Sequence, residues 1–493
     1  MDWGDILTKS LNKKRYEVEM INGNIFKNMI RYCIPLMLTG ILQLFYNAAD
    51  LVIVSNFSND PNALGAVGST GSLTALIVNL FMGLSVGTNV LSARSYAIKD
   101  KDGMSRIVHT SVLISILIGI VIGIFGFISA KWLLNIMSNP LPKAVTYIKI
   151  YFIGLPFMLL YNFSAAILRG VGDTKRPLYI LSISGLANVL LNLFFVIVCK
   201  MGVEGVAIAT LASQVISSIL IISCLLKTEE IYKLSLKELK IYKKEFFSML
   251  KIGLPAGIQS SLFSISNVLI QSSINKFGEA VMNGNTAANS LDGFVYTSMN
   301  SVYHASIAFT SQNVAAKRKE NIRKVLFYAL LLVFIIGLTT GGGFFLFGKT
   351  MLKIYTKDPF EIEVGYLKMH YLCLPYFIFG LMDVVSGSIR GMGNSLVPMI
   401  TSIIGICVLR VIWIFFIFNP NTNFTDYKDL SLLFISYPIS WVATLIVNII
   451  TYTFISKKVK QNMILKRACQ WQALFYLIVL LKRSEINCFL YKL

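Results

Sequence analysis

The chain has 493 residues, of which 55% are hydrophobic and only 14% are charged. Soluble domains carry about a quarter charged residues, so this composition excludes an ordinary soluble protein and indicates that most of the chain lies in lipid. The formal net charge of +21 could suggest a nucleic-acid binder, but the distribution of the basic residues argues against that class.

Apolar stretches long enough to cross the roughly 30 Å hydrocarbon core of a bilayer recur twelve times. They predict membrane-spanning helices near 29–56, 63–92, 106–130, 145–168, 176–199, 201–226, 247–275, 286–312, 324–347, 366–389, 396–418 and 431–455. We therefore expect an all-α integral membrane protein. Its predicted parts are a cytoplasmic N-terminal segment (1–28), an N-terminal bundle (29–226), a cytoplasmic linker (227–246), a C-terminal bundle (247–455) and a basic, interfacial cytoplasmic tail (456–493).

Charge patterning predicts the orientation of these parts. Lysine and arginine concentrate in the segments that would lie on the same side as the N-terminus, whereas the opposite side is left with scattered lysines such as Lys200 and Lys368. This asymmetry follows the positive-inside rule and predicts a protein of the cell membrane with both termini in the cytoplasm. The basic excess then attracts anionic membrane lipids, and we expect no nucleic-acid partner. In the linker, apolar residues at three- and four-residue spacing predict an amphipathic surface helix.

The two halves of the chain repeat one motif in register. Residues 168–177 read Leu-Arg-Gly-Val-Gly-Asp-Thr-Lys-Arg-Pro, and residues 389–398 read Ile-Arg-Gly-Met-Gly-Asn-Ser-Leu-Val-Pro. Arg169 and Arg390 lie 221 positions apart, and Pro35 and Pro255 lie 220 apart. The register predicts two pseudo-symmetric six-helix bundles from a duplicated unit. In membrane proteins, such repeats commonly rock around a central site, as secondary transporters do.

The first span carries an ionisable residue, Asp50. A charge within a span is costly unless it is paired or hydrated, so it marks a candidate functional site. Helical spacing places Gln43, Asn47 and Asp50 on one face, which we expect to point into the bundle and to contact substrate and ion. Burial would let Asp50 take up and release a proton in the neutral range, and its oxygens would also suit Na⁺. The alternative is a structural aspartate capped by amides. Pro35 removes one backbone hydrogen bond and gives this span a hinge.

Neutral polar residues recur at helical spacing in the neighbouring spans. Asn188 and Asn192 share a face of the fifth span, Thr210 and Gln214 share a face of the sixth, and Tyr147 lies at the start of the fourth. Together they predict a polar cavity near Asp50 that would hydrate a proton or coordinate Na⁺, with Gln214 available to substrate. Taken singly, each could equally join helices by hydrogen bonds.

The second half holds three further charges: Asp292 in the eighth span, Asp383 in the tenth and Arg410 in the eleventh. Arginine does not lose its proton and needs a partner, which Asp292 or Asp383 could supply. The remaining carboxylate would then be free to bind a cationic substrate. A buried ion pair that only fixes the bundle is an equally good interpretation.

The sequence lacks the motifs of ATP-driven transport, metal binding and enzymatic catalysis. The glycine run at 341–343 is not followed by the lysine–serine pair of a P-loop, and the three histidines lie far apart in sequence. No nucleophile–base pair or metal-binding set stands out. We therefore expect that the protein is not an enzyme and that it uses no cofactor beyond a coupling ion.

The residues described above resemble those of the multidrug and toxic compound extrusion (MATE) transporters. The resemblance rests on Pro35 followed fifteen residues later by Asp50, on the paired Arg-Gly-x-Gly loops and on the twofold layout. The stretches 65–71 and 284–288 resemble the bacterial branch of that family. The resemblance implies a monomeric inner-membrane antiporter with V-shaped bundles that exports amphipathic, often cationic, small molecules in exchange for H⁺ or Na⁺ by alternating access.

The resemblance also implies roles for individual residues. Asp50 matches the family's ion-carrying aspartate, Asn188 matches its fifth-span asparagine, and Tyr147 and Thr210 fall at supporting positions. Asn192 stands where the family has an acid, and the region 259–264 lacks a seventh-span glutamate that some members use for Na⁺. The alternative function is a flippase of the same superfamily for lipid-linked precursors, which would need a cationic cleft.

Overall fold

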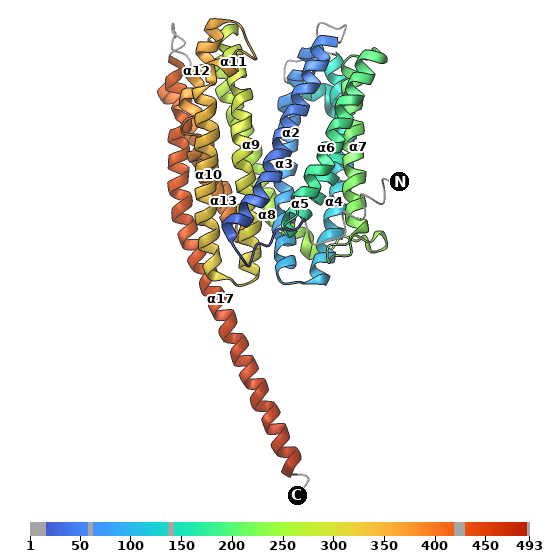
Figure 1. Cartoon of the computed structure of the whole chain (residues 1–493), viewed down its shortest axis with the longest axis vertical. Coiled ribbons are helices and arrows are strands. Elements are labelled where there is room, and N and C mark those ends of the chain that lie inside the picture. Colours follow the sequence, from blue (N-terminus) through green and yellow to red (C-terminus); the bar gives the residue numbers. More distant parts are fainter. Residues whose placement is uncertain (1–15, 58–62, 137–141, 419–428, 491–493) are drawn as a thin grey trace.

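The structure, a computed structural model, describes residues 16–57, 63–136, 142–418 and 429–490. The described part is helical, and its only extended pairing is one bridge between Glu17 and Asp173. Figure 1 shows two groups of helices side by side, one from the first half of the chain in blue to green and one from the second half in yellow to red. The all-α prediction is confirmed.

The first half contributes six long helices. They are α2 (Ile25–Phe57), α3 (Ala63–Ala97), α4 (Lys101–Ile136), α5 (Pro142–Val171), α6 (Lys175–Leu193) with its π-helical end η1 (Phe194–Val198), and α7 (Val203–Lys227).

The second half repeats this arrangement with more breaks. Its elements are α8 (Lys243–Asn275), α9 (Glu279–Ala315), α10 (Lys319–Leu346), α11 (Gly348–Leu352), α12 (Pro359–Leu372), α13 (Tyr376–Gly391), α14 (Leu396–Ser402), η3 (Ile403–Val408), α15 (Leu409–Ile412), η4 (Trp413–Phe418), α16 (Leu430–Phe434) and α17 (Ser436–Leu490). Helices α12 and α13 are bent by 46° where they meet, and together they are long and apolar enough for one span.

Within the described ranges, nine helices are long and apolar enough to cross a membrane, and the bent pair raises this number to ten. The two further expected spans are α8 and α9, which are 33 and 37 residues long but carry many serine, asparagine and glutamine residues. A long helix with so many polar groups needs a wet or polar surface on one side. Both helices border the main cavity described below, which accounts for their composition.

The duplicated loop has the same backbone shape in both halves. Gly172 has φ of 103° and Gly393, its counterpart 221 positions later, has φ of 91°. Only glycine adopts this left-handed region without strain, so it ends one helix and lets the next begin after a sharp turn. The second glycine of each Arg-Gly-x-Gly motif is therefore required by the turn between α5 and α6 and by the turn between α13 and α14.

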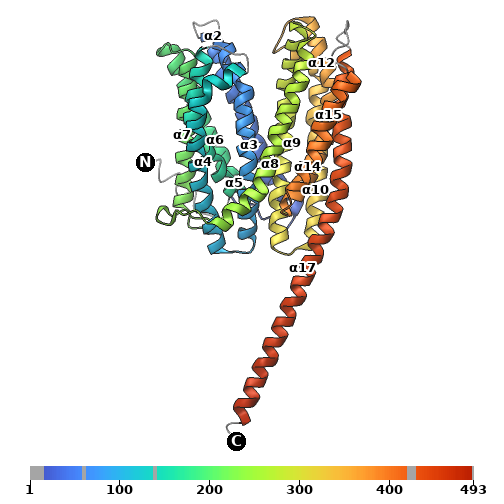
Figure 2. The same ribbon diagram turned by 180° about the vertical axis from the view of Figure 1, so that it is seen from behind.

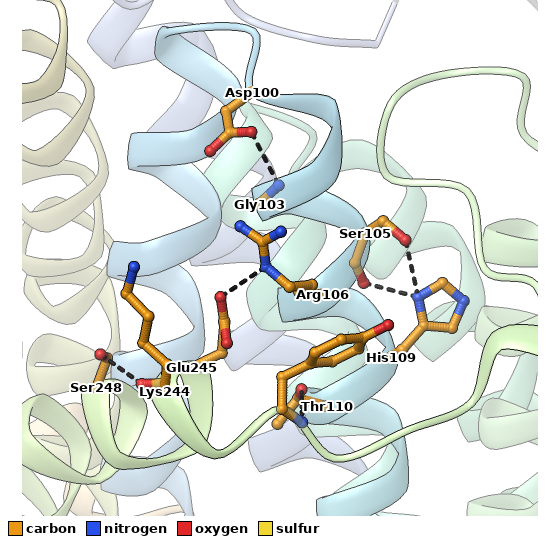
Figure 3. A network of polar contacts seen from close by, with 10 residues as sticks. Asp100, Gly103, Ser105, Arg106, His109, Thr110, Lys244, Glu245 and Ser248 are labelled. Atoms are coloured by element: carbon orange, nitrogen blue, oxygen red, sulfur yellow. Dashed lines mark hydrogen bonds and ion pairs between the residues drawn. The ribbon is translucent and has the colours of Figure 1, made fainter.

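The linker is not the amphipathic helix that its sequence predicts. Between α7 and α8 the structure has only a three-residue 3₁₀ turn, Leu236–Glu238. Polar contacts with α4 hold the segment instead: Ser235 N–H donates to His109 Nε2 at 3.0 Å, and Tyr242 N–H donates to Thr110 Oγ1 at 3.1 Å. Figure 3 shows these α4 residues beside the ion pair of Arg106 with Glu245, whose atoms lie 2.8 Å apart. The linker is therefore held against α4, where its sequence predicted a helix on the membrane surface.

The last helix is longer than the twelfth predicted span. Helix α17 runs without a break from Ser436 to Leu490, so the predicted boundary between 455 and 456 does not coincide with a helix end. Figures 1 and 2 show its C-terminal part extending away from the two bundles.

The two halves are packed together at one end of the molecule. A Cβ atom on Gly83 of α3 would lie 2.2 Å from the backbone of Gly257 in α8, so these helices touch through their glycines. At the same end, Gln312 Nε2 donates to the carbonyl of Gly170 at 2.8 Å, and Arg94 donates to the carbonyl of Gly391 at 3.1 Å. Small residues permit such close helix contact, and the arrangement closes this end of the space between the halves.

Candidate functional site

Asp50 lies in a polar pocket inside the first half. Its Oδ1 accepts a hydrogen bond from Asn192 Nδ2 at 2.5 Å, and Thr210 Oγ1 lies 3.5 Å from Oδ2. Asn192 Nδ2 also donates to Asn188 Oδ1 at 3.2 Å. Asp50 and the two asparagines are buried, and no lysine or arginine of the described residues pairs with the carboxylate. The pocket therefore combines a negative charge with neutral oxygens and amides.

Two other predicted members of this site differ in their placement. Tyr147 is buried on α5, close enough to interact electrostatically with Asp50. Gln214 is not beside Asp50 and does not line the main cavity. Its Oε1 lies against Gly154, where an added Cβ would approach within 2.1 Å. The prediction that Gln214 contacts substrate is therefore not supported by its position, because α5 covers this face of α7.

Asn192 has one further property that suits a site for a cation. Its Oδ1 is buried and accepts no hydrogen bond from any described residue. An acceptor left without a donor in a protein interior loses about 1–3 kcal/mol. A proton on the neighbouring carboxyl group or a bound Na⁺ would satisfy such an oxygen. Carboxylate, amide and hydroxyl oxygens are also the hard donors that Na⁺ prefers, so the residues present fit either ion.

The main cavity has a volume of about 830 Å³ and lies between the halves and within the second one. Gln43 and Asn47 line it from α2, whereas Asp50, on the same helix, is buried against α6 and α7. The predicted single polar face of the first span is therefore divided. Its first part faces the cavity and its last residue faces the interior of the first half, because three further positions turn the side chain away by about 60°.

Pro35 lies inside α2, which remains one helix on both sides of it. Thr39 Oγ1 donates to the carbonyl of Pro35 at 2.7 Å, a side-chain bond to the preceding turn of the kind that often bends a helix. The predicted hinge thus lies between the closed end of the molecule and the polar residues of α2.

The charges of the second half pair differently from the sequence expectation. Asp292 faces Lys368 with their charged atoms 3.7 Å apart, and Cys373 Sγ donates to Asp292 Oδ1 at 3.0 Å. Lys368 is only 2% exposed and also donates to Asn289. The sequence assigned Lys368 to the outer side of the membrane, and the structure adds that its side chain is buried in the bundle and lines the cavity. Its position within a predicted span was the available signal.

Arg410 pairs with neither aspartate. Its Nε donates to Ser440 Oγ at 3.0 Å, and its guanidinium lies 4.1 Å from the centre of the Tyr437 ring. Of the two partners considered for Arg410, Asp292 is paired with Lys368, and Asp383 forms no ion pair with Arg410 in the described part of the chain. Asp292, Asp383 and Arg410 nevertheless all line the cavity.

The arginines of the duplicated loops were not predicted as site residues, yet both reach the cavity. Arg390 donates to Tyr303 Oη and, at 2.5 Å, to Gln259 Oε1. Arg169 lies near His304, as does Arg390. The signal that could have identified them is the motif itself, which places a basic side chain at the end of an apolar helix in each half.

Comparison with known proteins agrees with this architecture. The sequence model of the MatE family matches the chain twice, over residues 35–194 and 255–416. The probable multidrug resistance protein YpnP of Bacillus subtilis is 25% identical over 80% of this chain and 88% of its own length. YoeA, a probable multidrug resistance protein of the same organism, is 24% identical over 88% of this chain and 95% of its own.

Among solved structures, an outward-facing multidrug resistance MATE transporter of the MOP superfamily has a similar fold, with a TM-score of 0.81. It is 24% identical and covers 91% of this chain and 99% of its own. The two family matches begin 220 residues apart and confirm the predicted duplication. The chain therefore belongs to the MatE family, the multidrug and toxic compound extrusion transporters.

Proposed function

We propose that the protein is a secondary active antiporter that exports amphipathic small molecules in exchange for H⁺ or Na⁺, with Asp50 as the carrier of the ion. The observation that carries this proposal is the buried carboxylate of Asp50. It has hydrogen-bond partners but no basic partner in the described part of the chain. A buried charge without a counter-ion is costly, so binding of a cation there relieves a large penalty.

Alternating access follows from the arrangement of the halves. In the state described, the halves are packed together at the end where α5 meets α6 and α13 meets α14. We place this end and both termini on the cytoplasmic side, as the positive-inside rule predicts. The ion drives the cycle only through a different affinity for the two states. Because Pro35, Asn47 and Asp50 share α2, bending near Pro35 would move the ion pocket and one cavity wall together.

The test uses everted membrane vesicles that contain the wild-type chain or Asp50→Asn. Uptake of two fluorescent dyes of opposite charge, rhodamine 123 and fluorescein, is followed under an imposed pH gradient and then under a Na⁺ gradient. We expect uptake of at least one dye that requires one of the gradients, and we expect Asp50→Asn to abolish it. The gradient that drives uptake identifies the coupling ion.

A matched control is Glu279→Gln, which neutralises an exposed carboxylate in the first turn of α9. This variant should transport as the wild type does. Uptake that persists without any gradient, or that is equal in Asp50→Asn and Glu279→Gln vesicles, would rule out the proposed coupling.

A further inference from the structure

The main cavity contains more positive than negative charge. Six charged side chains line it: the cations Arg169, Lys368, Arg390 and Arg410, and the acids Asp292 and Asp383. The four cations are each at most 8% exposed, so water screens them poorly. Inside a membrane such a set is expensive, and an excess of one sign calls for a ligand of the other sign.

The two acids do not balance this set. Asp292 is occupied by Lys368 at 3.7 Å, and Asp383 lies two helical turns from Arg390 on the same face of α13. That leaves Arg169 and Arg410, neither of which has a carboxylate partner in the described ranges. Arginine keeps its proton at all relevant pH values. A proton taken up by either acid would only increase the positive excess, so titration cannot reverse its sign.

Arg410 is the cation best placed to hold a ligand. It lies on α15, the short helix between the π-helical segments η3 and η4, and such irregular segments often mark functional sites. Only its Nε has a hydrogen-bond partner, Ser440, while Tyr437 supports one face of the guanidinium. The two terminal nitrogens donate to no described residue. A guanidinium with this free edge fits the paired oxygens of a carboxylate, sulfonate or phosphate.

A second cationic position lies deeper in the cavity. Arg169 and Arg390 come from the duplicated loops of the two halves and both lie near His304. The Nε atom of each is buried and has no hydrogen-bond partner among the described residues. One of these arginines belongs to each half, so both halves contribute positive charge to this part of the cavity.

The aromatic rings of the cavity do not favour a cationic substrate. Two of them already face guanidinium groups of the protein, Tyr437 that of Arg410 and Tyr303 that of Arg390. A substrate cation near these rings would meet like charge. The remaining lining rings offer apolar surface: Phe263, Tyr296, Tyr376, Phe379 and Trp441. The cavity volume of about 830 Å³ is within the usual range for a drug-sized ligand.

We propose that the substrate held in this cavity is an amphipathic organic anion, with its carboxylate, sulfonate or phosphate on Arg410 and its apolar body against the aromatic wall. This proposal rests on the proposed function, because it assigns the substrate class of the same transporter. It replaces the cationic substrate expected from the sequence. The anionic group could belong to a soluble compound or to the headgroup of a lipid-linked molecule.

The test measures binding separately from transport. Rhodamine 123 and fluorescein share a xanthene body and differ in charge, so they form a matched pair of probes. Fluorescence anisotropy at pH 8 gives the affinity of each dye for the purified full chain in detergent. We expect fluorescein to bind at least about tenfold more tightly than rhodamine 123. Arg410→Gln should weaken fluorescein binding about tenfold or more, as expected for the loss of a charged hydrogen-bonded contact, and should not weaken rhodamine 123 binding.

Two further variants guard against trivial explanations. Lys131→Gln removes an exposed positive charge on α4 and should leave both affinities unchanged. Arg410→Lys keeps the positive charge but not the planar guanidinium. We expect its affinity for fluorescein to lie between those of the wild type and Arg410→Gln, and its melting temperature to equal that of the wild type. Rhodamine 123 binding as tightly as fluorescein, or fluorescein binding that is equal in the wild type and in a folded Arg410 variant, would overturn the proposal.

Competition identifies the source of the anionic group. Farnesyl diphosphate and farnesol differ only in the charged head. If farnesyl diphosphate displaces fluorescein at lower concentration than benzoate derivatives do, and farnesol does not displace it, the anionic group belongs to a lipid-linked diphosphate. If the benzoate derivatives displace fluorescein at lower concentration than farnesyl diphosphate does, the anionic group belongs to a soluble aromatic acid. Because binding needs no gradient, tight Arg410-dependent binding without gradient-driven uptake would contradict the antiporter and keep the anion site. Gradient-driven uptake of rhodamine 123 but not of fluorescein would support the antiporter and contradict the anion site.

Discussion

The interiors of the two halves are opposites in charge although both derive from one repeated unit. In the first half, Asp50 is a carboxylate surrounded by amides and hydroxyls, without a basic partner in the described residues. In the second half, Arg410 is a guanidinium beside a hydroxyl and a ring, without an acidic partner there. The first arrangement suits a small cation and the second an anionic group. Under the two proposals above, the duplicated scaffold would keep the helix framework and use one half for the ion and the other for the substrate.

The largest effect should come from breaking the ion pair between Asp292 and Lys368 in the cavity wall. Asp292→Asn leaves the buried ammonium of Lys368 without its counter-ion, which costs about 3–5 kcal/mol of stability. We expect a strongly lowered melting temperature in detergent. The double variant Asp292→Asn, Lys368→Met removes both charges and should recover most of the loss. A single variant as stable as the wild type would mean that this pair does not hold the second half together.

The contact between the halves gives the next largest effect. In Gly83→Ala the added methyl group would lie 2.2 Å from the backbone of Gly257, and overpacking of this kind costs about 1–3 kcal/mol. The closed arrangement should lose population. Cys33 reports this, because it is 3% exposed and its Sγ lies 3.8 Å from the carbonyl of Ser301 across the interface. Maleimide should label Cys33 faster in the variant.

Gly342→Ala provides the control for this experiment, because nothing lies within 4 Å of the position of its added Cβ. A Cys33→Ser background corrects for labelling of the other cysteines. Equal labelling rates in Gly83→Ala and Gly342→Ala would show that the two halves do not separate at this contact.

A smaller effect is expected at the ion pocket. Asn192→Ala removes the amide that donates to Asp50, and hydrogen bonds to charged groups contribute about 1.5–3 kcal/mol. The coupling-ion concentration that half-saturates transport should shift by about tenfold, with the maximal rate affected less. Gln214→Ala removes the same group from α7 away from Asp50 and should not shift it. An unchanged ion dependence in Asn192→Ala would move the coupling site elsewhere.

The smallest effect distinguishes the two copies of the loop. Asp173 Oδ1 accepts the N–H groups of Lys175 and Arg176, whereas its counterpart Asn394 accepts that of Val397. Burial raises the pKa of Asp173 to about 6 despite the nearby Arg176. Because the folded state favours the protonated acid, this group's contribution to stability falls as pH rises from about 4 through 6.

Asp173→Asn, which copies the second loop, should remove this pH dependence. The melting temperature of the wild type relative to the variant should therefore decline between pH 4.5 and pH 7.5. A difference that stays constant over this range would show that Asp173 does not change its protonation there.

Sequence reasoning identified the parts of the fold that periodicity and repetition encode. A polar cavity near Asp50 that includes Asn192 and Thr210 was expected, and the spans and the duplication follow from apolar length and from register. The placement of Lys368 did not, because a lysine near a span end is as compatible with the membrane surface as with the bundle. In the structure its side chain lies inside the bundle, facing Asp292.

The pairing of the buried charges was also beyond the sequence. Arg410, Asp292 and Asp383 lie on three different helices, and helical spacing says nothing about rotation of one helix against another. The prediction for the linker was wrong for a related reason. Its apolar spacing suits a surface helix, but Ser235 and Tyr242 form hydrogen bonds with α4 instead. In both cases contacts between helices, and not the spacing of residues along the chain, determined the structure.

The positive excess of the cavity has a consequence for how export responds to the membrane potential. If an organic anion leaves while a cation enters, both movements carry current in the same direction across the bilayer. Each charge moved through the field of an energised cell, negative inside, contributes about 2.3 kcal/mol per 100 mV. Exchange of a monovalent cation for one proton would move no net charge. The sign of Arg410 and its neighbours would thus make the transporter an electrogenic one that works with the electrical potential as well as the ion gradient.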